Sequence, residues 1–162
     1  MPRREEGFSL IELLIVVAII LIVAAIAIPS FIRSRIAANQ ASAIESLRVL
    51  GTSEVTYAAI FGNGYSSTLA ALGPPSAGAI PTASAAGLID DLLVSGTKSG
   101  YTFTYTPTLQ EPGTLRYNGY IILANPKDVG ITGIDFYYED ETHLIRMNAT
   151  APAGSTDSYV AD

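Results

Sequence analysis

A long apolar run near the N-terminus constrains this chain more than any other feature. Between Phe8 and Ile28, only Ser9 and Glu12 are not apolar. An α-helix needs about 20 mostly apolar residues to cross the hydrocarbon of a bilayer. The run reaches that length, so the sequence predicts a membrane-spanning helix over residues 8–28.

Glu12 lies inside this run, where a charged side chain needs a compensating partner. A carboxylate at the centre of a spanning helix costs roughly 2.5–3.5 kcal/mol on insertion scales, so an ionisable residue in such a segment indicates a function. The alternative is that Glu12, close to the helix start, is favoured by the helix dipole and reaches the membrane interface. Taken alone, the residue leaves both interpretations open.

A short motif surrounds Glu12 and begins in the charged N-terminus. It reads Arg3-Arg4-Glu5-Glu6-Gly7, then Phe8, then Glu12 four residues later. This string resembles the class III signal of type IV pilins and of the pseudopilins of type II secretion. The resemblance extends over residues 3–61. It implies that a prepilin peptidase cuts between Gly7 and Phe8 and methylates the new N-terminal Phe8, and that Glu12 pairs with the terminal amine of a neighbouring subunit.

An ordinary secretory signal is the competing interpretation of the N-terminus. Such a signal has an apolar core of about 7–15 residues, followed by a cleavage site of the small-x-small type. Here the apolar run is longer, and the stronger cleavage signal precedes it. Ala25-Ile26-Ala27 offers only a weak small-x-small match after the run.

Pro29 follows the apolar run inside a segment that otherwise reads as continuous helix. A proline in a helix removes one backbone hydrogen bond and clashes with the preceding turn. The sequence therefore predicts a kink at the membrane edge. The pilin resemblance implies a further role in subunit assembly, because in that family the segment before a matching proline can lose helical structure on entering the filament.

Helical patterning continues over residues 29–61. Apolar residues recur at about 100° per residue on one side of this segment, which makes it amphipathic. Gly62-Asn63-Gly64 then favours the end of the helix. We expect Leu47, Val55 and Ala58 to lie beneath a β-sheet, with Tyr101, Phe103 and Tyr105 opposite them.

The remaining residues, 62–162, predict a globular head with three parts. Glycine, proline and serine in 62–100 indicate a connecting loop, with short helices at 68–72 and 85–94. Period-two patterns predict strands, which short connections would make antiparallel. These strands are 101–106, 117–124, 134–138 and 143–147, with a turn at 139–142 and a loop or disordered tail at 148–162. The expected class is α+β with the pilin fold: a long N-terminal helix packed against an antiparallel sheet of about four strands.

Composition excludes several functions. The chain has 162 residues, a formal net charge of −6 and no cysteine. An acidic balance argues against direct nucleic-acid binding, which depends on basic side chains. Without cysteine there is no disulfide framework, thiolate nucleophile or Cys-ligated metal. His143 is the single imidazole and is expected to be an exposed strand residue, so the chain offers no acid–base set and is not expected to be an enzyme.

Acidic residues near the C-terminus suggest one cofactor. Calcium takes several carboxylate and carbonyl oxygens, and the related major pseudopilins hold calcium in a C-terminal loop. The candidate ligands are Asp135, Glu139, Asp140, Glu141 and Asp157. The alternative is a solvated acidic turn with no metal.

These features favour a structural subunit. The leading interpretation is a type IV pilin that is held in the bacterial inner membrane as a single-pass precursor and polymerises into an extracellular pilus. The alternatives are the major pseudopilin of a type II secretion system, which forms a periplasmic pseudopilus, and a membrane-anchored binding domain that never polymerises. Besides the membrane, the expected partners are copies of the chain, the prepilin peptidase and an inner-membrane assembly platform.

Overall fold

The computed structural model describes residues 7–160, so most of the expected leader, residues 1–6, lies outside the described residues. The chain divides into two compact units, Met1–Arg35 and Ile36–Asp162, which are treated separately below. Helix α1 (Leu10–Phe61) continues from the first unit into the second and contains Pro29. The predicted long N-terminal helix is confirmed.

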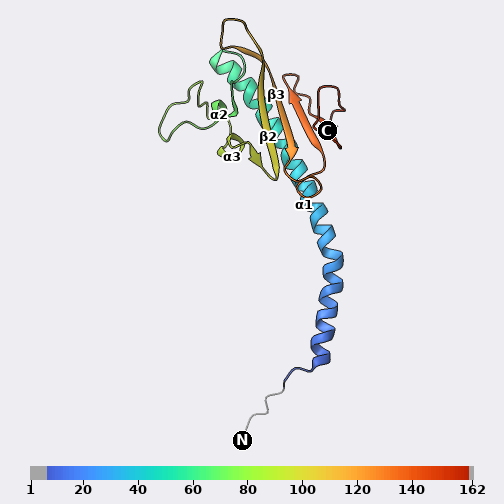
Figure 1. Cartoon of the computed structure of the whole chain (residues 1–162). Helices are drawn as coiled ribbons and strands as arrows, with labels where there is room; N and C mark the ends of the chain where they lie inside the picture. The colour runs from blue at the N-terminus through green and yellow to red at the C-terminus, as the bar shows by residue number, and fades with distance from the viewer. Residues whose placement is uncertain (1–6, 161–162) are drawn as a thin grey trace. The chain divides into compact units, whose positions relative to one another are not determined.

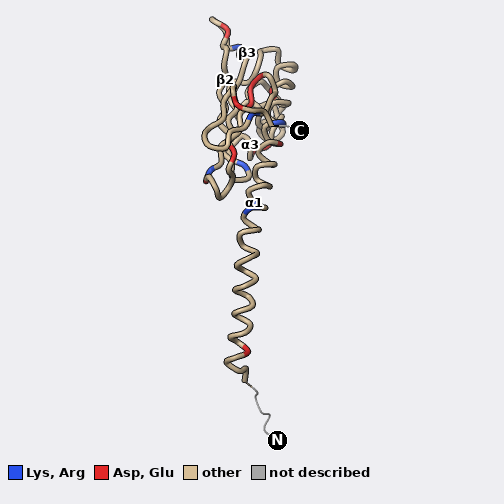
Figure 2. The backbone as a smooth tube through the Cα atoms, turned by 90° about the vertical axis from the view of Figure 1, so that its right-hand side faces the viewer, with Lys and Arg blue, Asp and Glu red and all other residues tan. Residues whose placement is uncertain are grey.

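In the first unit, α1 leaves its apolar side chains uncovered. Leu10 is 81% exposed, Leu21 64% and Ile28 58%. The helix is long and apolar enough to cross a membrane. Figure 2 shows one acidic position near the start of α1, which the sequence identifies as Glu12, followed by an uncharged stretch. A surface of this kind needs lipid or other protein to cover it.

The second unit contains one antiparallel sheet in which strands follow each other in chain order (Figure 1). Each strand pairs with the next, as in a meander. The strands are β1 (Thr97–Lys98), β2 (Tyr101–Gln110), β3 (Tyr117–Pro126), β4 (Phe136–Asp140) and β5 (Arg146–Asn148). The predicted α+β class is therefore confirmed, with five strands rather than about four. The additional strand, β1, is too short to show an alternating pattern.

The boundaries of all four predicted strands differ from the prediction; β3 ends two residues later, at Pro126, and β5 begins later, at Arg146. β2 continues past Pro107, which pairs with Tyr120 of β3. Pro107 is tolerated because β1 pairs only with the start of β2, so no strand needs an N–H from this position. β4 extends to Asp140, so the following turn lies after Asp140. His143 belongs to that turn with φ of 60°, and its assignment to a strand was wrong.

The core lies between the C-terminal part of α1 and the sheet. Leu47 and Leu50 of α1 are fully buried, as are Tyr101 and Tyr120 of the sheet. Phe103 is also buried and Tyr105 is partly buried in the same cluster. These contacts confirm the predicted placement of Leu47 beneath the sheet.

The predicted burial of Val55 was wrong, because the buried stripe of α1 is rotated relative to the apolar pattern. Val55 is 47% exposed and Ala58 only half-buried, whereas Ser53 and Glu54 are buried. Ser53 donates from Oγ to the carbonyl oxygen of Leu88 at 3.2 Å. Buried polar groups are tolerated when they are hydrogen-bonded, and hydrophobic periodicity does not detect them.

Two short helices and a loop cover the side of the core. α2 (Leu69–Leu72) matches its prediction, but α3 (Asp91–Val94) begins later than expected. Residues 86–89 are not helical because their backbone N–H groups bond to α2 and its C-cap Gly73, for example Leu88 N to Leu72 O at 2.8 Å.

The C-terminal tail forms no regular element within the described residues, as predicted, but it pairs with β5. Met147 N donates to Ser158 O at 2.8 Å, and Val160 N donates to Ile145 O at 2.8 Å. These bonds occupy the outer edge of β5, which would otherwise be open to pairing with another chain.

Leu47 provides a direct test of this core. We expect Leu47→Ala to lower the free energy of unfolding of the chain from Ile36 onward by about 2–5 kcal/mol, because truncation of a buried leucine leaves a cavity. Val55→Ala is the matched control and should change it by less than about 0.5 kcal/mol. Chemical denaturation followed by circular dichroism measures both, and equal losses from the two variants would contradict the assigned stripe.

Candidate functional site

The N-terminal candidate residues lie at the start of α1 and are open to solvent. Phe8 is 90% exposed. A Cβ added at Gly7 would meet no atom within 4 Å. A peptide bond between a small residue and an exposed aromatic residue, just before an apolar helix, is accessible to an enzyme at the membrane surface.

Glu12 closes the first turn of α1. Its Oε2 accepts a hydrogen bond from Ser9 N at 2.9 Å, and Leu13 N donates to Ser9 O at 3.2 Å. Ser9-x-x-Glu12 is thus the spacing of a capping box, in which a glutamate at the third helical position reaches back to the N-cap N–H. Among residues 7–160, the other oxygen, Oε1, accepts no hydrogen bond. Glu12 therefore has a local role and still offers one acceptor to a second group.

Pro29 does not converge with these residues. It lies inside α1, on the exposed surface of the first unit. It lies seventeen positions after Glu12, which corresponds to about 25 Å along a helix. The N-terminal candidates thus lie along a helix surface and do not form a pocket.

The structure does not bring the calcium candidates together. Among the described residues, no three acidic or histidine side chains converge where they could hold a metal ion. Asp135 accepts a bond from Gln40, and Asp157 accepts one from Asn148 at 3.1 Å. The acidic residues are therefore held by separate protein groups.

Asp140 and Glu139 differ although they are neighbours in β4. Asp140 accepts hydrogen bonds from Tyr138 Oη at 3.1 Å and from Thr142 N at 3.0 Å. Burial opposes ionisation of this carboxyl, but the bonds from Thr142 and Tyr138 lower its pKa. Because alternate residues of a strand point to opposite faces, Glu139 points the other way, toward α1.

Glu139 is a buried carboxyl without a hydrogen-bond partner for one oxygen. It is 2% exposed, and its Oε2 accepts no bond. Its Oε1 lies 3.7 Å from His143 Nδ1, which in turn is 3.3 Å from Tyr120 Oη. Burial raises the pKa of Glu139 to about 8, and the nearby charge of Asp140 adds to the shift.

Gly51 makes room for this carboxyl. A Cβ at Gly51 would overlap Glu139 Oε1 and touch His143 Nδ1. Glycine at this helix position therefore lets α1 and β4 approach closely. Hydrophobic periodicity gives no sign of a carboxyl opposite Gly51.

Glu54 is a second buried carboxyl that sequence analysis missed. Its oxygens accept bonds from Ser66 N at 2.8 Å and Ser66 Oγ at 2.6 Å, while Tyr105 Oη donates to Ser66 O at 2.7 Å. Burial raises the pKa of Glu54, and the bonds from Ser66 oppose that rise. The arrangement ties α1, the following loop and β2 together, so its role is structural.

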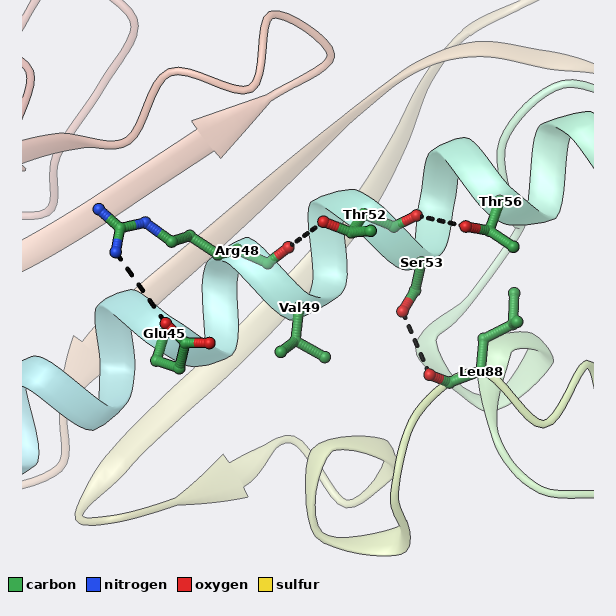
Figure 3. Close-up of a pocket in the computed structure, with 7 residues that line it drawn as sticks. All are labelled: Glu45, Arg48, Val49, Thr52, Ser53, Thr56 and Leu88. Atoms are coloured by element: carbon green, nitrogen blue, oxygen red, sulfur yellow. Dashed lines mark hydrogen bonds and ion pairs between the residues drawn. The ribbon is translucent and has the colours of Figure 1, made fainter. Parts of the chain in front are cut away.

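A groove of about 350 Å³ lies along α1 beside the loop that carries Leu88. Figure 3 shows the side chains that line it. Its hydroxyl groups bond within the protein: Thr52 Oγ1 to Arg48 O and Thr56 Oγ1 to Thr52 O, each at 2.8 Å. Glu45 lies 4.0 Å from Arg48 Nη1 in an exposed ion pair. Because these polar groups are directed to their own helix, the groove does not present a set of groups converging on a ligand.

Comparisons with known proteins concern the N-terminal residues. Residues 2–28 match a family model described as a prokaryotic N-terminal methylation motif. A protein described as "Type IV major pilin protein PilA", from Myxococcus xanthus (strain DK1622), is 50% identical over 54 residues, which are 33% of this chain. The match spans 24% of that relative's own length. No solved structure is significantly similar to this chain.

The motif match includes Gly7, Phe8 and Glu12, the residues that carry the resemblance in the sequence. The helix-and-sheet architecture agrees with the fold expected from that resemblance. This chain therefore begins with a prokaryotic N-terminal methylation motif and resembles the type IV pilins.

Proposed function

We propose that this protein is a type IV pilin, a structural subunit that polymerises through its N-terminal helix into an extracellular filament. The observation that carries the proposal is an exposed apolar helix that follows Gly7-Phe8 directly and contains Glu12, within the segment that matches the N-terminal methylation motif. The named relative is a major pilin, which favours a pilus over a pseudopilus.

The proposed maturation uses Gly7 and Phe8. A prepilin peptidase cuts the bond between them and transfers a methyl group to the amine of Phe8. The apolar run then anchors the subunit in the inner membrane, because its length suits a bilayer. An assembly platform in that membrane then moves the subunit into the filament.

The proposed assembly step pairs Glu12 with the Phe8 amine of a neighbouring copy. In lipid, helices gain little hydrophobic energy from meeting each other, so a polar contact has more influence. Opposite charges about 4 Å apart attract by about 4 kcal/mol at an effective dielectric constant near 20. Oε2 of Glu12 can keep its bond to Ser9 N while Oε1 accepts from the incoming amine. This contact would fix the axial position of each subunit, and Pro29 would allow α1 to adjust to its neighbours.

Processing at Gly7 is the first test. Protein sheared from cells should begin at Phe8 and carry one added methyl group on intact-mass and N-terminal peptide analysis. Gly7→Val should abolish this species, because a branched side chain next to the cleaved bond crowds the peptidase. Gly154→Val, in the C-terminal tail where an added Cβ would meet no atom within 4 Å, is the control for the effect of a valine elsewhere.

Other outcomes identify the alternatives. An intact leader, or a chain that starts after Ala27, would contradict the proposal. Correctly processed protein that stays in the periplasm, with a secretion defect on deletion, would identify a pseudopilin. Processed monomers without any polymer would indicate a membrane-anchored binding domain.

A further inference from the structure

Two asparagines of this chain are followed by glycine, and the proposed function uses neither of them. Asn63-Gly64 comes just after the end of α1 at Phe61, and Asn118-Gly119 lies in β3. Asparagine is a thermolabile residue. It is most labile before glycine, because the backbone nitrogen of a residue without a side chain can reach the amide carbon of the asparagine. The two dipeptides have the same chemistry, so any difference between them comes from the fold.

The asparagine side chains differ in their hydrogen bonds. Both residues are exposed, so access to water does not distinguish them. Asn118 Oδ1 accepts a bond from Arg116 Nε at 3.1 Å. The side-chain amide of Asn63 makes no hydrogen bond within residues 7–160. The amide of Asn63 is therefore the freer of the two to turn toward the next peptide nitrogen.

The glycine nitrogens differ as well. Gly119 pairs with Thr108 in the ladder between β2 and β3. Phe103 N donates to Gly96 O on the other side of β2, so by the alternation of a strand Thr108 directs its backbone groups toward β3 and engages Gly119. In the part of the chain that the structure describes, Gly64 N donates to no acceptor. A nitrogen that donates no hydrogen bond is the more readily deprotonated and the better nucleophile.

The backbone at Asn63 belongs to neither a helix nor a sheet ladder. Gly62 N donates the last bond of α1, to Ala58 O at 3.0 Å. Gly62 and Gly64 have φ of 68° and 73°, conformations that favour glycine. Beyond them the chain makes only isolated bridges with Tyr117. Asn63 therefore lies between two glycines, where regular structure does not hold the amide carbon away from the next nitrogen.

We propose that Asn63 is a site of spontaneous deamidation in the folded protein, whereas the sheet protects Asn118. The nitrogen of Gly64 loses its proton and forms a bond to Cγ of Asn63. The bond from Cγ to Nδ2 breaks, and ammonia leaves with that proton. Water then opens the succinimide ring at one of its two carbonyl carbons and gives aspartate or isoaspartate, so the reaction needs only water.

The two products affect the contact between the end of α1 and β3 differently. Tyr65 N donates to Tyr117 O at 2.8 Å, and Gly64 packs so close to this oxygen that an added Cβ would overlap it. Isoaspartate lengthens the main chain by one carbon just before Gly64, and this close contact leaves no room for it. Aspartate keeps the main chain and adds one negative charge near the C-terminus of α1, which the helix dipole disfavours only weakly. The isoaspartate form is therefore the less stable product.

The test uses the full-length chain in detergent micelles, incubated for days at 37 °C and mildly alkaline pH, with and without guanidinium chloride. Lys98 and Arg116 lie between the two sites, so trypsin places the sites on different peptides. The peptide that ends at Lys98 has Asn63 as its single amide side chain. Mass spectrometry measures the conversion of each peptide, and electron-transfer fragmentation distinguishes isoaspartate from aspartate.

In the folded protein, we expect Asn63 to convert several-fold faster than Asn118. In guanidinium chloride the two rates should become similar, because the sheet no longer protects Asn118. Asn63→Gln is the matched variant that keeps an amide, and its peptide should stay unmodified because a six-membered ring forms far more slowly. Thermal unfolding should place Asn63→Asp close to the fresh protein and the isoaspartate form at a lower temperature.

Equal rates at the two sites in the folded protein would overturn the proposal. Conversion of Asn63 only in guanidinium chloride would overturn it too, because the fold would then protect both sites. An isoaspartate form that unfolds at the same temperature as Asn63→Asp would contradict the predicted effect on the contact with β3.

Discussion

Glu12→Ala is expected to produce a protein that is cleaved, methylated and held in the membrane but forms no filaments. The cleavage site at Gly7 and the apolar run are unchanged, so the early steps proceed. The lost carboxylate removes the proposed attraction to the Phe8 amine, about 4 kcal/mol per subunit contact. Because every subunit makes the same contact, the loss repeats along the polymer. Electron microscopy of sheared material and immunoblots of the membrane and sheared fractions measure this result.

Glu12→Gln separates assembly from helix capping. Its side-chain carbonyl can still accept the bond that Ser9 N donates, but it carries no charge. If Glu12 only caps α1, the glutamine variant forms filaments normally. If it pairs with an amine, the variant fails like alanine, while Glu12→Asp is partly active. Glu45→Gln is a control in the exposed ion pair on the second unit, and normal filaments from Glu12→Ala would rule out the pairing.

The N-terminal half could be predicted because its signal depends only on residues that are close together in the sequence. A helix that can cross a bilayer is apolar on all sides, so length and composition are enough to identify the apolar part of α1, up to Ile28, without knowledge of its neighbours. The same holds for Gly7, Phe8 and Glu12, whose spacing along the chain defines the motif. The capping contact between Ser9 and Glu12 also follows a local sequence rule.

The head was less predictable because its decisive contacts join residues far apart in sequence. Glu54 reads as an exposed helix residue until Ser66 supplies two donors. Its burial rotates the packed face of α1 and leaves Val55 outside. The pairing of β4 with β3 likewise places Glu139 opposite Ile122 and draws it into the core, where an acidic run had suggested a turn.

Glu139 gives the head an expected pH dependence with a definite sign. Its folded pKa, about 8, lies above the ordinary value of 4.5. Folding therefore favours the protonated carboxyl: the associated stability is fully present below about pH 4.5 and is lost as the pH rises through 8. Each pH unit between the two pKa values lowers the free energy of unfolding by about 1.4 kcal/mol. The total loss from this carboxyl is therefore at most about 5 kcal/mol. Glu54, whose pKa is also raised, acts in the same direction.

Denaturant unfolding of the chain from Ile36 onward, at pH 5, 7 and 9, tests this expectation. The free energy of unfolding should fall steadily across the series. Glu139→Gln should remove much of the change of the free energy of unfolding with pH. At pH 9 this variant should be more stable than the unmodified protein, because the amide keeps the shape next to Gly51 without a buried charge. Glu111→Gln, an exposed substitution, should keep the original slope. The groups near Glu139 are His143, Tyr120 and its neighbour Asp140. Arg48 lines the same surface pocket as Glu139 and His143. If one of them compensates the charge at high pH, Glu139→Gln and the unmodified protein will show the same slope, and the carboxyl will have no part in the pH response.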